Sequence, residues 1–147
     1  MAASSASDLS QRICSVFDID KLADFQEKAI LNISKGKDTY LSCKTGSGKS
    51  LTYECALVVF GSGTITLVIA PLTSIMQQQV ERLTKLGFTA VLIESSCSVS
   101  EKDLVNGCYE FVFGSPELLV GTTRWREVIK DTTFQKRHRL TVVDEVI

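Results

Sequence analysis

Paired cysteines and histidines are scarce in this chain of 147 residues. No C-x-x-C pair occurs among its five cysteines, and His138 is its one histidine. Structural zinc sites need several such ligands at short spacing, so we expect no zinc in this segment. Unpaired, scattered cysteines are typical of a reducing compartment, and we interpret them as reduced thiols.

Long apolar runs are also lacking. Apolar stretches such as ALVVF at Ala56–Phe60 are far shorter than the roughly 20 residues that cross a bilayer. The opening MAASSASDLSQR contains no apolar signal-peptide segment. We therefore expect neither a membrane partner nor secretion, and we expect residues 1–16 to form a flexible N-terminal tail.

The sequence also lacks an excess of positive or of negative charge. Sixteen Lys and Arg residues face 17 Asp and Glu residues, which gives a formal net charge of −1. This balance neither supports nor excludes nucleic-acid binding, because a local groove can be basic on a neutral protein. The basic run KRHR at 136–139 is interpreted first as a solvated surface. With 44% hydrophobic and 22% charged residues, the composition is that of one globular domain.

Strand-like and helix-like segments alternate from Thr39 onward. Apolar, β-branched runs predict strands, and 3.6-residue spacing of apolar side chains predicts helices. Alternation of this kind predicts an α/β fold with a mostly parallel sheet, helices on both faces, and a ligand at the carboxyl ends of the strands. The expected strands are 39–43, 64–70, 89–93, 109–115 and 139–146, and the expected helices are 49–60, 74–86, 100–107 and one that begins at Pro116.

The stretch CKTGSGKS at 43–50 has the chemistry of a phosphate-binding loop. Gly46 and Gly48 permit the positive φ angles with which consecutive N–H groups surround an anion. Lys49 is expected to bridge the β- and γ-phosphates, and the Ser50 hydroxyl to bind Mg²⁺. The predicted ATP contacts in the loop are Lys44, Thr45, Gly46, Ser47, Gly48, Lys49 and Ser50. A plain Gly/Ser-rich turn is the alternative, and the strand before and helix after the loop favour phosphate binding.

The segment VVDE at 142–145 resembles a Walker B sequence. An Asp at the carboxyl end of a strand can hold Mg²⁺ through water, which is the role expected for Asp144. The adjacent Glu145 can polarise the attacking water. By itself an apolar run that ends in two acids is weak support for a metal site, but the phosphate loop makes it a coherent hypothesis.

Taken in this order, the segments resemble the first RecA-like domain of a RecQ-type DNA helicase of superfamily 2. CKTGSGKS is similar to the form A-x-x-G-x-G-K-[ST] found in that superfamily. Residues 69–93, IAPLTSIMQQQVERLTKLGFTAVLI, resemble the family's motif Ia, and FVFGSPELL at 111–119 resembles motif Ib. FQEKAI at 25–30 places Gln26 where the family has its adenine-reading glutamine. The resemblance covers residues 17–147.

The resemblance implies an ATP-dependent DNA helicase of 3′–5′ polarity that uses ATP and Mg²⁺. It implies catalytic roles for Lys49 and Glu145, and a second RecA-like domain outside this chain. It implies a nuclear location if the source is eukaryotic and a cytoplasmic one otherwise. Contacts to single-stranded or forked DNA are implied for Pro71, Thr73, Ser74, Gly114, Ser115 and Pro116.

The sequence departs from the family at two positions near Gln26. The family pattern F-R-x-x-Q would place an aromatic residue at Leu22 and an arginine at Ala23. Selectivity for adenine is therefore less secure than phosphate binding.

The last expected strand bears on whether the sequence contains every strand of the ATP-binding domain. In this family a further strand, which carries motif III, lies between the Walker A and Walker B strands. We therefore expect residues 17–147 to be an ATP-binding domain truncated after its Walker B strand, with marginal stability and no motor activity alone. One alternative is a catalytically inactive module that binds ATP or single-stranded nucleic acid and acts through partners. An unrelated P-loop kinase or GTPase is less favoured, and the N-K-x-D of a GTPase does not occur.

Overall fold

The structure, a computed structural model, describes residues 6–42, 48–71, 74–94 and 99–144. The chain divides into two compact units, Met1–Gly61 and Ser62–Ile147. In the described ranges, no helix combines the length and the apolar character that crossing a membrane requires.

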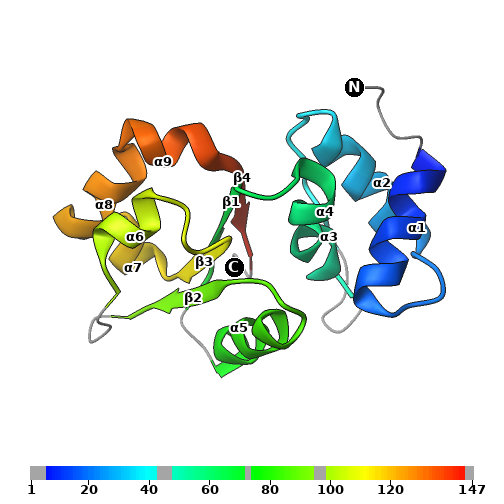
Figure 1. Ribbon diagram of the computed structural model, residues 1–147, viewed down its shortest axis with the longest axis horizontal. Helices are drawn as coiled ribbons and strands as arrows, with labels where there is room; N and C mark the ends of the chain where they lie inside the picture. Colours follow the sequence, from blue (N-terminus) through cyan, green and yellow to red (C-terminus); the bar gives the residue numbers. More distant parts are fainter. Residues whose placement is uncertain (1–5, 43–47, 72–73, 95–98, 145–147) are drawn as a thin grey trace. The chain divides into compact units, whose positions relative to one another are not determined.

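Helices make up the regular structure described in the first unit: α1 (Ala6–Phe17), α2 (Asp24–Ser34), α3 (Leu51–Glu54) and α4 (Ala56–Phe60) (Figure 1). The flexible tail predicted for residues 1–16 is wrong from Ala6 onward, because α1 is helical there. Its residues Leu9, Ile13 and Phe17 recur every fourth position and form one apolar stripe, which is the pattern of a packed helix. Ile13 and Phe17 are buried.

The segment before the phosphate loop differs from expectation. A strand was predicted at 39–43, but Thr39–Ser42 form no strand, and Cys43 lies outside the described residues. Tyr40 in this segment is 93% exposed. A strand persists only when a neighbour completes its backbone hydrogen bonds, and none of the described strands pairs with these residues.

The helix predicted at 49–60 is divided into α3 and α4. The division falls at Cys55, whose ψ angle of 7° departs from helical geometry. The surrounding sequence contains Thr52, Tyr53, Val58 and Val59, and β-branched or aromatic residues lower helix propensity.

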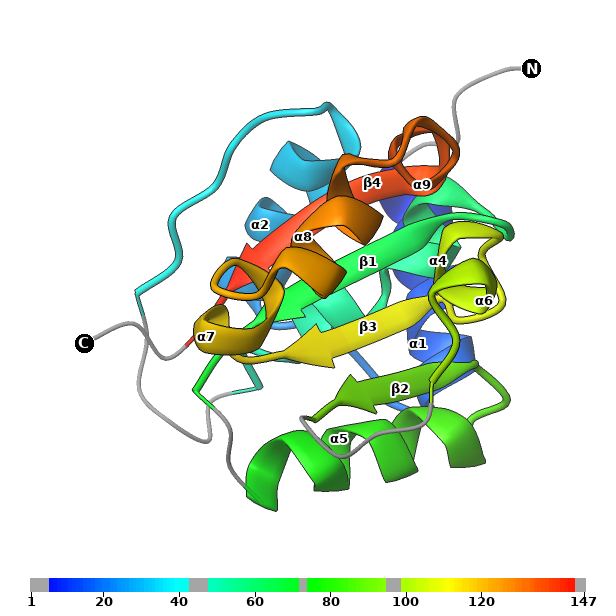
Figure 2. The same ribbon diagram turned by 90° about the vertical axis from the view of Figure 1, so that its left-hand side faces the viewer.

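The second unit is built on a parallel sheet of β1 (Ile65–Ile69), β2 (Ala90–Ile93), β3 (Phe111–Gly114) and β4 (His138–Val143). The strand order is β2-β3-β1-β4 (Figure 2). Ile69 pairs with Gly114 on one side and Val143 on the other, so the carboxyl ends of three strands are aligned. The predicted parallel α/β arrangement is confirmed, and each of these strands overlaps a predicted one.

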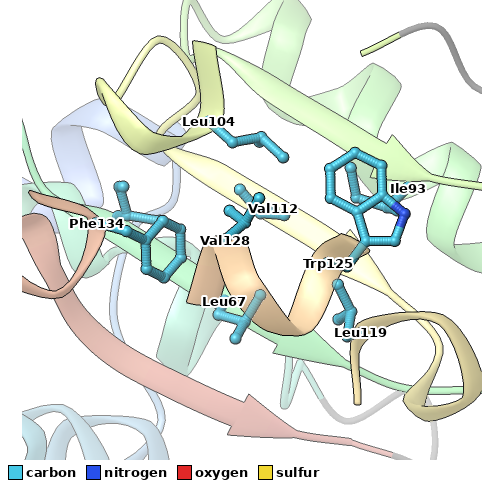
Figure 3. Packing of buried hydrophobic residues seen from close by; sticks show 9 residues of the cluster. Leu67, Ile93, Leu104, Val112, Leu119, Trp125, Val128 and Phe134 are labelled. Carbon is cyan, nitrogen blue, oxygen red and sulfur yellow. The ribbon is translucent and has the colours of Figure 1, made fainter. Parts of the chain in front are cut away.

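The helices of this unit are α5 (Ser74–Lys85), α6 (Glu101–Val105), α7 (Pro116–Leu119), α8 (Thr123–Lys130) and α9 (Thr132–Arg137). Helix α5 runs alongside β2, whereas α6 to α9 lie together over one face of the sheet (Figure 2). Strand and helix residues meet there in a buried cluster (Figure 3). Its members are Ile65, Leu67, Ile93, Leu104, Val112, Leu119, Trp125, Val128 and Phe134.

The basic run at 136–139 lies where α9 leads into β4, at the opposite end of β4 from Asp144. Arg137 Nη1 donates to the carbonyl of Gly63 at 3.3 Å, and Arg139 Nη1 donates to the carbonyl of Lys136 at 2.9 Å. Two of the three cations in this run therefore hydrogen-bond to the protein's own backbone. The arrangement gives no support to a nucleic-acid contact by this run.

The ring of His138 is half-buried against Phe134, with 5.4 Å between ring centroids. Its Nε2 lies 3.1 Å from the Leu140 carbonyl and 2.8 Å from Thr141 Oγ1. Burial lowers the pKa of His138, and the hydrogen bond to Leu140 opposes that change only in part. A lowered pKa means that the folded state favours the neutral ring.

We therefore expect acid to destabilise this unit through His138. The contribution is constant above the unfolded-state pKa of about 6.5 and is lost as the pH falls toward the lower folded-state pKa. The free energy of unfolding, measured by urea titration from pH 7.5 to pH 5, should fall less steeply in His138→Asn than in wild type. Equal slopes for the two proteins would contradict this assignment, because the carboxylates titrate alike in both.

Candidate nucleotide-binding site

The described end of the phosphate loop is Gly48-Lys49-Ser50 in the first unit. Gly48 has a φ angle of +87°, as predicted, in the left-handed region that glycine adopts without strain. The carbonyl of Lys49 accepts hydrogen bonds from the Thr52 amide at 3.1 Å and from Thr52 Oγ1 at 2.6 Å. These bonds join the loop directly to α3. The predicted contacts Lys44, Thr45, Gly46 and Ser47 lie outside the described residues.

Gln26 contacts this loop from α2. Its Nε2 donates to the Gly48 carbonyl at 2.9 Å, and its Oε1 accepts from the Ala23 amide at 2.9 Å. A Cβ atom built at Gly48 would lie 2.7 Å from Gln26 Nε2, so the amide packs against the open side of the glycine. Sequence reasoning selected Gln26 but missed this contact, which joins residues 22 positions apart and has no local signal. Reading of adenine by Gln26 stays a prediction.

Asp144 follows β4 in the second unit. Its amide donates to the Ile69 carbonyl at 2.9 Å, which extends the hydrogen bonding between β1 and β4 by one residue. The residue is half-buried at the carboxyl end of the strand, the position that the sequence predicted for it. Glu145 lies outside the described residues, and its predicted catalytic role is not tested by the structure.

The residues predicted to contact DNA follow neighbouring strands. Pro71 comes shortly after β1, and Gly114 to Pro116 span the turn from β3 into α7. The Ala70 amide donates to the Gly114 carbonyl at 3.1 Å, which holds these two strand ends together. A Cβ at Gly114 would lie 2.8 Å from the Leu119 side chain, so glycine lets α7 pack closely on the strand end.

The residues predicted to contact DNA differ in their exposure. Pro71 and Pro116 are exposed, whereas Ser115 is buried. Ser115 Oγ accepts from the Leu118 amide at 3.4 Å and so caps α7. Ser74 begins α5, and Thr73 lies outside the described residues. The hydroxyl of Ser115 is therefore engaged in the turn itself, an arrangement that the sequence motif did not reveal.

Comparison with known proteins agrees with this geometry. Residues 23–146 match the family described as DEAD/DEAH box helicase. The chain belongs to this family. Its relatives include RecQ-type helicases, which confirms the resemblance found in the sequence.

The sequence identity and the share of each protein that the match covers are given for three of these relatives. It is 30% identical to the ATP-dependent helicase SGS1 of Saccharomyces cerevisiae, over 91% of this chain and 10% of that protein. It is 34% identical to the ATP-dependent DNA helicase RecQ of Pasteurella multocida, over 74% of this chain and 18% of that protein. It is 29% identical to the ATP-dependent DNA helicase Q1 of Pongo abelii, over 89% of this chain and 21% of that protein. The chain thus spans about a tenth to a fifth of the length of these relatives.

A solved structure shows the same fold. The DUF1998 helicase MrfA, crystallised with DNA and AMPPNP, superposes with a TM-score of 0.72 over 97% of this chain and 21% of that one. At 16% sequence identity, this likeness concerns the fold alone.

Proposed function

We propose that this chain is the ATP-binding part of the motor of a RecQ-type, 3′–5′ ATP-dependent DNA helicase. The observation that carries the proposal is the left-handed Gly48, held by Gln26 and followed directly by Lys49 and Ser50 in a member of the helicase family. Residues 17–147 would belong to its first RecA-like domain, and a second such domain would complete the motor. The resemblance to this family would imply a nuclear location in a eukaryote and a cytoplasmic one otherwise.

The residues proposed to hold the nucleotide are those of the loop 44–50. The Lys49 ammonium would pair with the phosphate oxygens, and backbone N–H groups of the loop would donate to them. The Ser50 hydroxyl and the Asp144 carboxylate, both on half-buried residues, are oxygen donors of the kind that Mg²⁺ prefers. When bound, Mg²⁺ would neutralise phosphate charge. Glu145 would orient and deprotonate the attacking water.

The DNA proposal rests on the aligned strand ends of the second unit. Exposed residues and backbone groups at Pro71 and at the Gly114–Pro116 turn would contact the sugar-phosphate backbone, together with Thr73 and Ser74. Contacts of this type position a strand without reading its sequence. MrfA, which has the same fold, was crystallised with DNA, and this supports DNA as the partner.

Titration of the chain with a fluorescent ATP analogue, with Mg²⁺ or with EDTA, tests the proposal. We expect saturable binding that Mg²⁺ tightens on the order of tenfold, which corresponds to about 1.4 kcal/mol. A chain that shows no saturable binding in either condition would contradict it. Saturable binding without ATP hydrolysis would also agree with the proposal, because hydrolysis would require the second RecA-like domain.

A further inference from the structure

We infer that Thr52 is a positioning residue for nucleotide binding, because its hydroxyl fixes the peptide group that joins Lys49 to Ser50. This peptide group contains the Ser50 amide, a donor for a phosphate oxygen, and it leads directly to the Ser50 hydroxyl, the proposed ligand of Mg²⁺. The inference rests on the proposed function and deepens it, since it gives a role to a residue that lies outside the phosphate-loop motif.

The first support is the pair of hydrogen bonds that the Lys49 carbonyl accepts from Thr52. The Thr52 amide lies 3.1 Å from this oxygen, and Thr52 Oγ1 lies 2.6 Å from it. The turn is tight, because the amides of Leu51, Thr52 and Tyr53 each donate to the carbonyl three residues earlier. Hydrogen bonds of this i→i−3 type have poorer geometry than α-helical ones, so the hydroxyl strengthens the hold on the Lys49 carbonyl.

The second support is the direction of this peptide group. A trans peptide is planar, and its carbonyl and its N–H point in opposite directions. Because the Lys49 carbonyl points to Thr52 in α3, the Ser50 N–H of the same peptide group points away from α3. Backbone N–H groups directed in this way are the donors with which a turn binds an anion. The Thr52 hydroxyl therefore fixes the direction in which the Ser50 amide donates.

The third support is that the polar groups of Ser50 remain available to a ligand. Ser50 has helical backbone angles, φ −61° and ψ −29°, and its side chain caps no helix. With the residues that the structure describes, neither its hydroxyl nor its amide forms a hydrogen bond. The two hydroxyls thus differ in role: that of Thr52 is engaged within the protein, whereas that of the half-buried Ser50 can bind Mg²⁺.

The fourth support is the buried surroundings of Thr52. The residue is 7% exposed, so water has little access to compete for its hydroxyl. Its carbonyl accepts a hydrogen bond from Cys55 Sγ at 3.5 Å, at the residue where α3 and α4 divide. Burial raises the pKa of Cys55 to about 12, so the thiol keeps its proton and donates at neutral pH. Thr52 is therefore held at its carbonyl while its hydroxyl holds Lys49.

Binding of a fluorescent ATP analogue to the full chain, measured with Mg²⁺ and with EDTA, tests the inference. Thr52→Val keeps the branched shape of the side chain and removes the hydroxyl. We expect it to weaken binding about fivefold with Mg²⁺, the usual effect of one lost hydrogen bond, and only about twofold with EDTA, where the Ser50 hydroxyl has no metal to bind. Thr52→Ser keeps the hydroxyl and should bind within about twofold of wild type in both conditions.

Thr122→Val is the matched control. Thr122 Oγ1 donates to the Leu118 carbonyl at 2.6 Å, so this variant loses a bond of the same kind and length in the second unit. Its dissociation constants should stay within about twofold of wild type, because the lost bond involves none of residues 48–50. Should Thr52→Val fail to fold, Thr52→Ala, which also lacks the hydroxyl, takes its place.

Equal losses with Mg²⁺ and with EDTA would indicate a general structural defect and would overturn the inference. A Thr52→Ser variant that binds as weakly as Thr52→Val would overturn it as well, since the methyl group and not the hydroxyl would then matter. If wild type binds the analogue and Thr52→Val binds it equally well, the inference fails and the proposed function stands.

A second measurement needs no nucleotide. The carbonyl ¹³C resonance of Lys49 depends on the hydrogen bonds that this oxygen accepts, so it should shift in Thr52→Val and not in Thr122→Val. An unchanged resonance in Thr52→Val would contradict the contact on which the inference rests. A wild-type chain that binds no analogue, with or without Mg²⁺, would overturn the proposed function and the positioning role together, even if the Lys49 resonance shifts as expected.

Discussion

Replacement of Lys49 by alanine is expected to weaken ATP binding by roughly 10- to 150-fold. The estimate follows from the value of a hydrogen bond to a charged group, about 1.5–3 kcal/mol. Alanine removes the one side-chain cation that directly follows Gly48, and the small residue leaves the backbone of the loop in place. The dissociation constant of a fluorescent ATP analogue, measured by anisotropy with Mg²⁺ present, is the quantity to compare.

Lys35→Ala is the matched control for this experiment. Lys35 is an exposed lysine at the end of α2, so its removal changes the net charge by the same amount. The dissociation constant of Lys35→Ala should stay within about twofold of wild type, because the charge of an exposed lysine is screened by salt. If Lys49→Ala bound the analogue as tightly as Lys35→Ala does, the phosphate-loop assignment would be wrong.

Replacement of Phe134 by alanine is expected to lower the free energy of unfolding by about 3–5 kcal/mol. Phe134 is 1% exposed and packs in the cluster between the sheet and α6 to α9 (Figure 3). Truncation of its ring removes apolar contacts and leaves a cavity that rigid neighbours cannot fill. A loss of this size is a large fraction of the total stability of a typical domain, about 5–15 kcal/mol.

Urea unfolding followed by tryptophan fluorescence measures this loss directly. The chain has one tryptophan, Trp125, which belongs to the same cluster, so its emission reports on the packing that the substitution disturbs. Val120→Ala, at a residue that is 55% exposed, serves as control and should change stability by less than about 0.5 kcal/mol. A loss below about 1 kcal/mol in Phe134→Ala would contradict the packing described for this unit.

Much of the second unit is predictable from local sequence. The run at 64–70 is apolar or β-branched throughout, which requires burial on both faces, and it forms β1. The spacing of Met76, Val80 and Leu83 predicts α5, and Gly87, with a φ of +97°, follows its end. In both cases one local pattern and the tertiary environment favour the same structure.

Other parts depend on partners that are distant in sequence. TYLSC at 39–43 has strand composition, yet strand formation also requires a paired neighbour, which composition does not reveal. Helix α1 was missed because small polar residues dominate its beginning, although Ile13 and Phe17 carry its buried face. The contact of Gln26 with Gly48 likewise depends on packing of α2 beside the loop.

In the candidate site, too, some features follow from local sequence and others depend on distant partners. The backbone requirement at Gly48 follows from the residue type, because glycine adopts positive φ without strain, and the structure agrees. The hydrogen bond that the Ser115 hydroxyl accepts from the Leu118 amide could not be predicted, since it depends on how closely α7 packs on the end of β3. A motif identifies the residues of a turn, whereas the surrounding packing decides which of their atoms remain available to a ligand.

The position of β1 within the sheet has a consequence for synthesis of the protein. β1 lies between β3 and β4, and the ribosome makes both partners only after α5 and β2. Synthesis proceeds at about 5–20 residues per second, so the apolar run ITLVI lacks its second partner strand for on the order of several seconds. During that interval at least one edge of β1 can pair with strands of other chains. Slower translation between β1 and β4 would lengthen this exposure, so the aggregated fraction of newly made chains should depend on elongation rate as well as on the stability of the folded protein.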